Sequence, residues 1–273
     1  MAKEQKEMSF LGHLEELRWH LVRSASAIFI LAIVFFIFAE EVYDHFLLAH
    51  IKPDFITYNV FCDFFNLFGL DSAFCNVSFE NNKLQSIKVT SQLMNSIWSS
   101  LILGVILSFP YLLWEIWRFV SPGLTTNEIK RSRGFIFLAS FLFFIGVLFS
   151  FYIIAPISIH FLYNYQITDA IQNSFTLESH IGLVTNMLLG VSILFELPVL
   201  IYFLTKIGLV TPNFLKKYRK HALVVVLILA AIITPPDIAS QVIVAIPILI
   251  LYEISIKVSR RVIKKQEKNA RKG

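Results

Sequence analysis

The chain has 273 residues, of which 56% are hydrophobic and only 16% are charged, and its mean hydropathy is +0.67. Soluble proteins carry about 25% charged residues, so this composition excludes a soluble globular protein and indicates an integral membrane protein. The formal net charge of +5 does not indicate nucleic-acid binding. Lysine and arginine lie in short clusters between apolar segments and therefore report membrane topology.

The chain begins with an amphipathic segment over residues 10–23. Phe10, Leu14, Leu17 and Leu21 recur there at helical spacing and share one face. Because an apolar segment follows directly, residues 10–23 are predicted to form a helix that lies along the membrane surface.

Two adjacent glutamates, Glu15 and Glu16, fall within this amphipathic segment, at the edge of the membrane. One interpretation is an intrahelical ion pair between Glu15 and Arg18, with Glu16 in solvent. The other is that the glutamates bind a basic partner, because they lie on a face where lysine and arginine normally gather. The sequence leaves both interpretations open.

Six apolar segments are predicted to cross the membrane as α-helices, because lipid offers no other partner for backbone polar groups. They cover residues 22–39, 97–117, 135–163, 181–204, 222–233 and 238–256. The predicted fold is therefore an all-α integral membrane protein with six transmembrane helices in a single membrane domain, residues 1–273.

The fifth segment is short, because twelve residues at 1.5 Å each span about 18 Å of a hydrocarbon core about 30 Å thick. We expect the hairpin of the last two helices to thin the bilayer locally. The alternative is that residues 215–221 lengthen the fifth helix on the cytoplasmic side, with their lysines reaching the interface.

The distribution of lysine and arginine sets the orientation of the chain. All but Lys52, Lys83 and Lys88 lie in the N-terminal segment, in the second and fourth connections, or in the tail of residues 257–273. Both termini are therefore predicted to be cytoplasmic, and the loop of residues 40–96 external. Cys62 and Cys75 in that loop are candidates for a disulfide, since the outer side of a bacterial inner membrane is oxidising.

No sequence motif for catalysis, nucleotide binding or metal ligation is present. The chain contains no Walker loop, HExxH, GxSxG or cysteine cluster, and its seven histidines are scattered. The sequence therefore predicts no enzyme, no cofactor and no metal site.

The second connection, from Trp117 to Glu128, joins polar and apolar features. Its Ser-Pro-Gly ends the second helix, and Glu128 follows where a carboxylate can stabilise the next helix N-terminus. Glu128 also joins Glu16 on one membrane face, beside Phe119 and Leu124. Two carboxylates beside apolar surface suit a peptide in which adjacent arginines precede an apolar segment.

Four motifs together resemble the TatC family, the multispanning receptor subunit of the twin-arginine protein translocase. In chain order they are His13-Leu14-Glu15-Glu16-Leu17-Arg18, Trp117-x-Phe119-x-x-Pro122-Gly123-Leu124 followed by Glu128, Phe195-Glu196-x-Pro198, and Thr234-Pro235-Pro236-Asp237-x-x-Ser240-Gln241. The resemblance runs from about Ser9 to Arg260 and includes the six-span plan.

The resemblance implies a receptor in the bacterial cytoplasmic membrane that binds twin-arginine signal peptides. It would export folded cargo proteins using the proton-motive force, as a homo-oligomer in a complex with single-span subunits of the TatA and TatB type. The implied signal-peptide-binding residues are Glu16, Arg18, Phe119, Pro122, Leu124 and Glu128. The implied partner-helix docking residues are Glu196, Pro198, Asp237 and Gln241.

A secondary transporter that uses the intramembrane carboxylate of Glu196 is the alternative function. Such transporters usually carry repeated halves with broken helices, and this sequence shows no internal repeat.

Overall fold

The structure is a computed structural model that describes residues 10–69, 75, 84–120, 132–168, 170, 173–234 and 238–270. Within these residues the chain is helical, and the only β-type pairing described is an isolated bridge between Gln85 and Thr176. The all-α prediction is therefore confirmed.

The chain divides into two compact units, Met1–Ala39 with Ser96–Phe141 and Glu40–Asn95 with Leu142–Gly273. The sequence predicts a single membrane domain. The single membrane domain stays a prediction.

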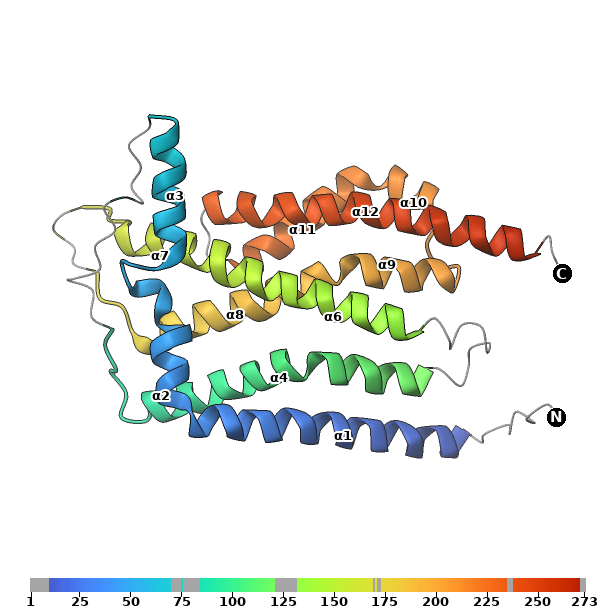
Figure 1. Ribbon diagram of the computed structural model, residues 1–273, viewed down its shortest axis with the longest axis horizontal. Coiled ribbons are helices and arrows are strands. Elements are labelled where there is room, and N and C mark those ends of the chain that lie inside the picture. The colour runs from blue at the N-terminus through green and yellow to red at the C-terminus, as the bar shows by residue number, and fades with distance from the viewer. Residues whose placement is uncertain are drawn as a thin grey trace. The chain divides into compact units, whose positions relative to one another are not determined.

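The first unit is built on helices α1 (Phe10–Ile37) and α4 (Ser91–Val120), which run antiparallel (Figure 1). They lie in close contact at Gly104, where an added Cβ would lie 2.8 Å from the Ile28 carbonyl oxygen and 3.0 Å from the Ala32 nitrogen. No side chain fits into that space, so glycine permits this approach. Pro110 lies inside α4 without ending it.

Helix α1 is continuous, so the predicted separate helix along the membrane surface is wrong. A single helix runs from Phe10 to Ile37, and its candidate membrane span begins at Leu14. No proline or glycine lies between Leu14 and Ser24 to end the helix. Glu15 and Glu16 are therefore carried on the cytoplasmic end of the first span itself.

The second unit contains an external segment and the remaining spans. The external elements are α2 (Ala39–Val42), the π-turn η1 (Tyr43–Leu47), the 3-10 turn η2 (Ala49–Ile51) and α3 (Ile56–Leu67). The third span is α6 (Ser132–Phe149), the π-turn η5 (Ser150–Ile154) and α7 (Ala155–Asn164), and the fourth is α8 (Leu177–Phe195) and α9 (Leu197–Lys206). The last elements are α10 (Pro212–Lys217), α11 (Arg219–Ile233) and α12 (Ile238–Ala270).

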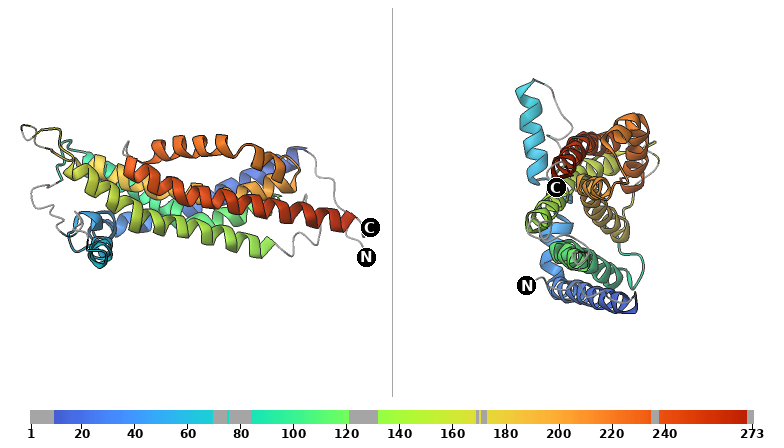
Figure 2. Two further views of the ribbon diagram at one scale, coloured as in Figure 1. Left: turned by 90° about the horizontal axis from the view of Figure 1, so that it is seen from above. Right: turned by 90° about the vertical axis from the view of Figure 1, so that its right-hand side faces the viewer.

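Helix α12 organises the second unit, because it lies along both α9 and α11 (Figures 1 and 2). A cluster of buried side chains, Ile201, Leu215, Tyr252 and Ile256, fills the contact with α9 and α10. The Tyr252 hydroxyl also donates to the Leu215 carbonyl over 2.8 Å. Burial and hydrogen bonding therefore fix the same contact.

Two prolines explain the irregular turns within the third and fourth spans. Proline has no N–H, so it leaves the carbonyl four residues earlier without its helical donor. Before Pro156 this frees the carbonyl of Tyr152, which accepts a 2.6 Å bond from the Thr57 hydroxyl of α3. Pro198 begins α9 after the break at Glu196.

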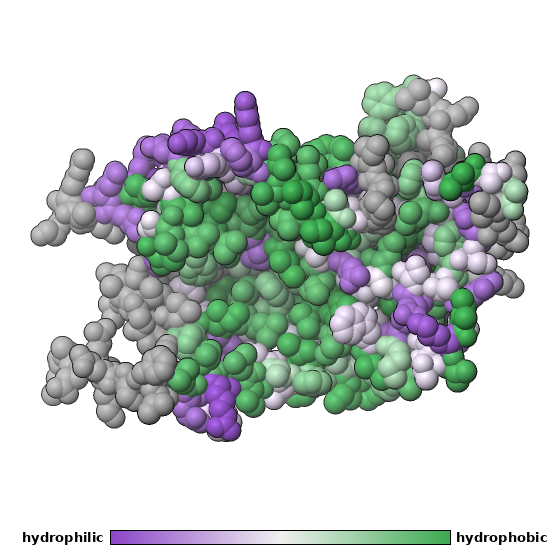
Figure 3. All heavy atoms as spheres, turned by 180° about the vertical axis from the view of Figure 1, so that it is seen from behind, coloured by the Kyte–Doolittle hydropathy of each residue, from purple (hydrophilic) through white to green (hydrophobic). Residues whose placement is uncertain are grey.

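Five described segments are long and apolar enough to cross a membrane. They are Leu14–Ile37, Ser91–Phe119, Ile136–Asn164, Leu177–Lys206 and Ser240–Lys268. Apolar side chains cover much of the face shown in Figure 3, and hydrophilic ones gather mainly toward its ends.

Helix α11 contains the fifth predicted span and it is short. Its 15 residues span about 22 Å, less than a hydrocarbon core of about 30 Å. Residues 219–221 lengthen it on the cytoplasmic side, but residues 215–217 do not, because a break at Tyr218 separates α11 from α10. Local thinning of the bilayer at this hairpin stays a prediction.

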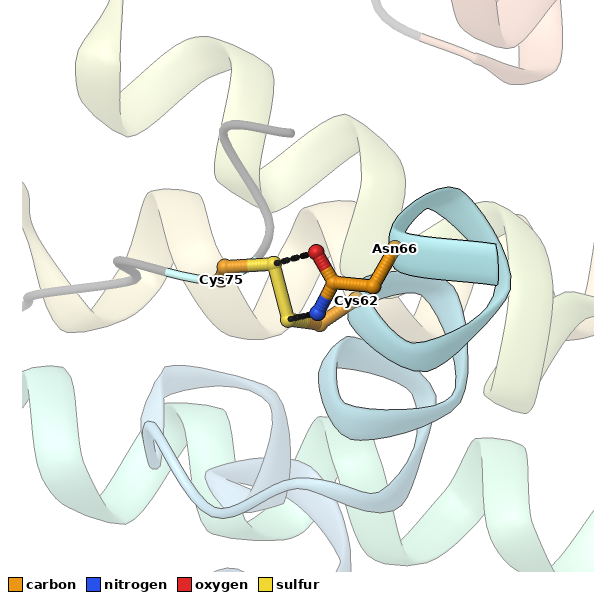
Figure 4. The surroundings of a disulfide bond; sticks show 3 residues. All are labelled: Cys62, Asn66 and Cys75. Carbon is orange, nitrogen blue, oxygen red and sulfur yellow. Dashed lines mark hydrogen bonds between the residues drawn. A yellow bond between two sulfur atoms is a disulfide. The ribbon is translucent and has the colours of Figure 1, made fainter. Parts of the chain in front are cut away.

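The external segment contains a disulfide between Cys62 of α3 and Cys75 (Figure 4). The Cα atoms of the two residues are 4.8 Å apart. Asn66, one turn after Cys62, lies beside both sulfur atoms.

Candidate functional site

The first candidate site lies at the cytoplasmic end of the first unit. Glu15 and Arg18 form an ion pair of 3.6 Å, and both side chains are more than half exposed. Glu16 is half-buried, and its Oε2 is buried without a hydrogen-bond partner among the described residues. The intrahelical pair expected from the sequence is present, but Glu16 is not the solvated carboxylate of that interpretation.

A buried carboxylate oxygen without a donor is costly, because desolvation is not offset by a hydrogen bond. Glu16 is therefore poised to accept a hydrogen bond from outside the described chain. The neighbouring pair makes Arg18 unavailable to Glu16, because its guanidinium is turned toward Glu15.

Sequence reasoning missed the buried acid next to this site, Glu115 of α4. Its side chain is 1% exposed and is bonded by the Nδ1 of His20, while the Tyr111 hydroxyl donates over 3.0 Å. Arg23 and Arg118 lie 3.5 Å and 3.6 Å away. The signal in the sequence is an acid inside an apolar helix, with tyrosine four residues before it and arginine three residues after.

Phe119 reaches the same end of the first unit. Its half-buried ring lies 6.1 Å from the ring of His20, which is one turn along α1 from Glu16. The structure thus brings together the helix turns that carry Glu16, Arg18 and Phe119. Pro122, Leu124 and Glu128 lie outside the described residues.

The second candidate site is the break between α8 and α9 at Glu196. Both carboxyl oxygens of Glu196 are buried, and neither makes a hydrogen bond of normal geometry within the described chain. Its polar neighbour is the backbone of Phe143 on α6. Pro198 is buried two residues later. A buried acid without a bonded partner lies here in the middle of a membrane-spanning helix pair.

A groove with a volume of about 420 Å³ lies close to this break, since Ile193, one turn before Glu196, is one of its walls. Helix α8 and the end of α11 form the groove. Its lining residues are Leu183, Asn186, Leu189, Gly190, Ile193, Ile232, Ile233 and Thr234.

Pro198 and Gln241, also named from the sequence, are not among the residues that line this groove. The side-chain N–H of Gln241 in α12 donates to the Leu227 carbonyl of α11 over 3.0 Å, so Gln241 holds these two helices together. Asp237 lies outside the described residues. In the part of the chain that the structure describes, no group of three or more His, Cys, Asp or Glu side chains is placed to hold a metal ion.

The fold and the two sites define a multi-pass, all-α membrane protein that presents unpaired buried carboxylates at a cytoplasmic helix end and within a span. A family model described as Sec-independent protein translocase protein (TatC) matches residues 12–247. The TatC protein of Blattabacterium sp. subsp. Periplaneta americana is 42% identical over 97% of this chain and 100% of its own length. That of Carboxydothermus hydrogenoformans is 35% identical over 98% and 100%.

A solved structure agrees with the sequence comparisons. The crystal structure of a twin-arginine translocase receptor TatC superimposes with a TM-score of 0.70 at 30% identity, covering 92% of this chain and 99% of that one. The chain belongs to the TatC family of Sec-independent protein translocases, a family of transport components. It is a multi-pass protein of the inner membrane, and both of its termini are cytoplasmic.

Proposed function

We propose that this chain is the receptor and core subunit of a twin-arginine translocase. It binds twin-arginine signal peptides on the cytoplasmic face and exports folded proteins with the proton-motive force, without catalysing a chemical reaction itself. The observation that carries this proposal is the buried, unpaired Oε2 of Glu16 at the cytoplasmic end of α1.

The chemistry of a twin-arginine peptide matches this site. A guanidinium presents a rigid fork of donors that bonds a carboxylate at two points, and such charge-assisted bonds are among the strongest in proteins. Glu16 accepts one arginine, and by motif position Glu128 accepts the other. Phe119, with Pro122 and Leu124 by motif position, offers apolar surface to the segment that follows the arginines.

Arg18 has an indirect role in this proposal. Its ion pair with Glu15 keeps both charges occupied, so the peptide meets one acceptor on α1, Glu16, and not two. Glu15 thus has its partner within the chain, and Glu16 is left to bind the peptide.

The test compares Glu16→Gln with Glu15→Gln, a matched change one residue away. The purified chain in lipid nanodiscs is titrated with a labelled twin-arginine signal peptide. Loss of a hydrogen bond to a charged group is worth about 1.5–3 kcal/mol, so Glu16→Gln should weaken binding by roughly 10- to 150-fold. Glu15→Gln should change it less than about fivefold, because exposed ion pairs contribute under about 1 kcal/mol.

A peptide with two lysines in place of the arginines serves as the ligand control. It should bind weakly to the unmodified chain and be insensitive to Glu16→Gln, because lysine cannot form the two-point bond. Equal losses for Glu15→Gln and Glu16→Gln, with normal yields of both variants, would contradict the proposal.

We also propose that Glu196 is the docking point for a single-span subunit of the TatA or TatB type. A polar side chain on the partner's helix would bond the unpaired carboxyl within the membrane, where hydrogen bonds between helices assist association. The nearby groove, with Asn186 and Thr234 in its walls, provides surface for the partner's helix. Pro198, Asp237 and Gln241 belong to this proposal by motif position.

Crosslinking to the single-span subunits tests the docking role. Glu196→Ala should abolish the crosslinks and export while leaving signal-peptide binding intact, whereas Glu196→Gln should keep partial function because an amide still hydrogen-bonds. The control is Glu178→Ala in the first turn of α8, which removes only an exposed 3.0 Å ion pair with Lys88. Crosslinks at wild-type level in Glu196→Ala would show that the carboxyl serves the chain's own packing.

A further inference from the structure

The external helix α3 has an apolar face that the described chain leaves uncovered. Ile56, Val60, Phe64, Leu67 and Phe68, called here the α3 stripe, recur at helical spacing, and each is between 54% and 83% exposed. Five large apolar side chains on one face of a short helix are not expected on a surface that faces water.

The polar side chains of α3 lie to one side of the stripe, and a disulfide ties the helix down. Asn59 and Asn66 are exposed about 60–80° around the helix from Ile56, whereas Asp63 lies only about 20° from it. Cys62 lies about 160° around the helix from Val60, since two residues turn an α-helix by about 200°. The disulfide therefore joins Cys75 to the polar face of α3 and leaves the α3 stripe open (Figure 4).

Helix α3 runs across the spans of its own unit. In Figure 1 it stands perpendicular to α8 and α12, and the end-on view of Figure 2 shows it projecting sideways from them. Because those spans cross the membrane, a helix perpendicular to them lies in the plane of the bilayer. In Figure 3 this projection lies at the upper right. Pale green, apolar side chains lie on its left, which is the side toward which the spans extend.

The N-terminus of α3 is fastened at the outer boundary of the hydrocarbon core. Thr57 donates to the Tyr152 carbonyl over 2.6 Å, and the Tyr58 hydroxyl lies 3.3 Å from the Pro156 carbonyl. The third apolar segment begins at Phe135, and twenty residues at 1.5 Å each place Ile154 about 30 Å from it. The anchor points on either side of Ile154 thus lie at the depth where acyl chains meet headgroups.

We propose that α3 is an interfacial membrane anchor, with the α3 stripe inserted among the acyl chains of the outer leaflet and the disulfide-bearing face in water. Helices with this division of faces lie in the interface, where apolar burial binds them. Because α3 runs perpendicular to the spans from an anchor on the third of them, lipid is the occupant that its exposed apolar stripe meets. This anchor goes beyond signal-peptide recognition and is independent of it.

Site-directed spin labelling of the full chain in lipid vesicles tests the anchor. Single cysteines replace Val60 or Phe64 on the stripe and Asn59 or Asn66 on the polar face, and the native cysteines stay paired and unlabelled. These side chains are exposed, so their replacement removes little internal packing. Collision rates are measured with oxygen, which concentrates in lipid, and with a water-soluble nickel complex.

The anchor predicts a several-fold higher oxygen-to-nickel ratio at Val60→Cys and Phe64→Cys than at Asn59→Cys and Asn66→Cys. The ratios should be the same in zwitterionic and in partly anionic vesicles, because Asp63 is the only charged residue of α3. Equal ratios at all four positions would overturn the proposal. Low collision rates with both reagents at the stripe would also overturn it, in favour of contact with a second copy of the chain.

Discussion

The bond between His20 and Glu115 offers a quantitative test of how the first unit is held together. The carboxylate is 1% exposed and the imidazole side chain 8%, so water does not replace a lost partner. Replacing His20 by alanine removes one of four groups around a buried charge. The expected result is a less stable protein that still folds.

The remaining contacts of Glu115 set the magnitude. Removing the sole partner of a buried charge costs about 3–5 kcal/mol. Here the Tyr111 hydroxyl stays at 3.0 Å, and the arginines at positions 23 and 118 stay within 3.6 Å, although they are 41% and 47% exposed. The loss for His20→Ala should therefore approach that of one hydrogen bond to a charged group, about 2 kcal/mol.

Thermal unfolding of the purified protein in detergent measures this loss. About 2 kcal/mol should lower the Tm by roughly 4–8 °C for a chain of this size. The control is Glu15→Gln, which breaks an exposed ion pair on the same helix and should cost less than about 1 kcal/mol. A Tm for His20→Ala equal to that of Glu15→Gln would refute the reasoning.

A double variant separates the worth of the pair from the cost of orphaning one partner. His20→Leu combined with Glu115→Leu removes both polar groups and leaves apolar side chains between the helices. Apolar replacement of a buried ion pair is often neutral, so the double variant should be more stable than Glu115→Leu or His20→Leu alone. Additive losses would show that the two residues act independently.

Two further predictions concern a helix crossing and the external segment. Gly104→Ala should cost about 1–3 kcal/mol by thermal unfolding, because its Cβ meets the backbone of Ile28, whereas Gly182→Ala, with open space around it, should be neutral or stabilising. Burial lowers the pKa of His50 to about 4, and the nearby His180 adds to this shift. The unfolded chain then binds more protons at His50 below pH 6.5, so this one residue should lower stability by about 2 kcal/mol between pH 8 and pH 5, and His50→Gln should remove that part of the pH dependence.

Much of the fold follows from local sequence, because lipid leaves helices as the only way to satisfy the backbone. The apolar segments at residues 97–117, 135–163 and 181–204 are found inside longer helices, and Pro198 marks a real break. Helix ends extend beyond the apolar segments because polar residues continue a helix into the interface. Hydropathy alone therefore underestimates their length.

The sequence fails where packing between distant residues decides the outcome. An amphipathic segment before a span can turn onto the membrane surface or continue the span, and its own pattern suits both. In the structure His20, which lies inside the continuous helix α1, bonds Glu115 of α4, 95 residues away. Gln241 is a similar case, since its bond to Leu227 depends on how the last two helices meet.

Whether a carboxylate has a partner within the chain distinguishes structural acids from candidate binding acids better than its position in the sequence does. Glu115, Glu178 and Glu253 all have partners within their own unit, the last an arginine at 2.7 Å. Among the carboxylates that the structure describes, Glu16 and Glu196 alone have buried oxygens without a partner. Leaving a buried acceptor unbonded costs about 1–3 kcal/mol, and a donor on another molecule recovers that cost on binding. Among the described acids, the two left unsatisfied, Glu16 and Glu196, are thus also the two that the motif resemblance assigns to binding, one for each class of partner.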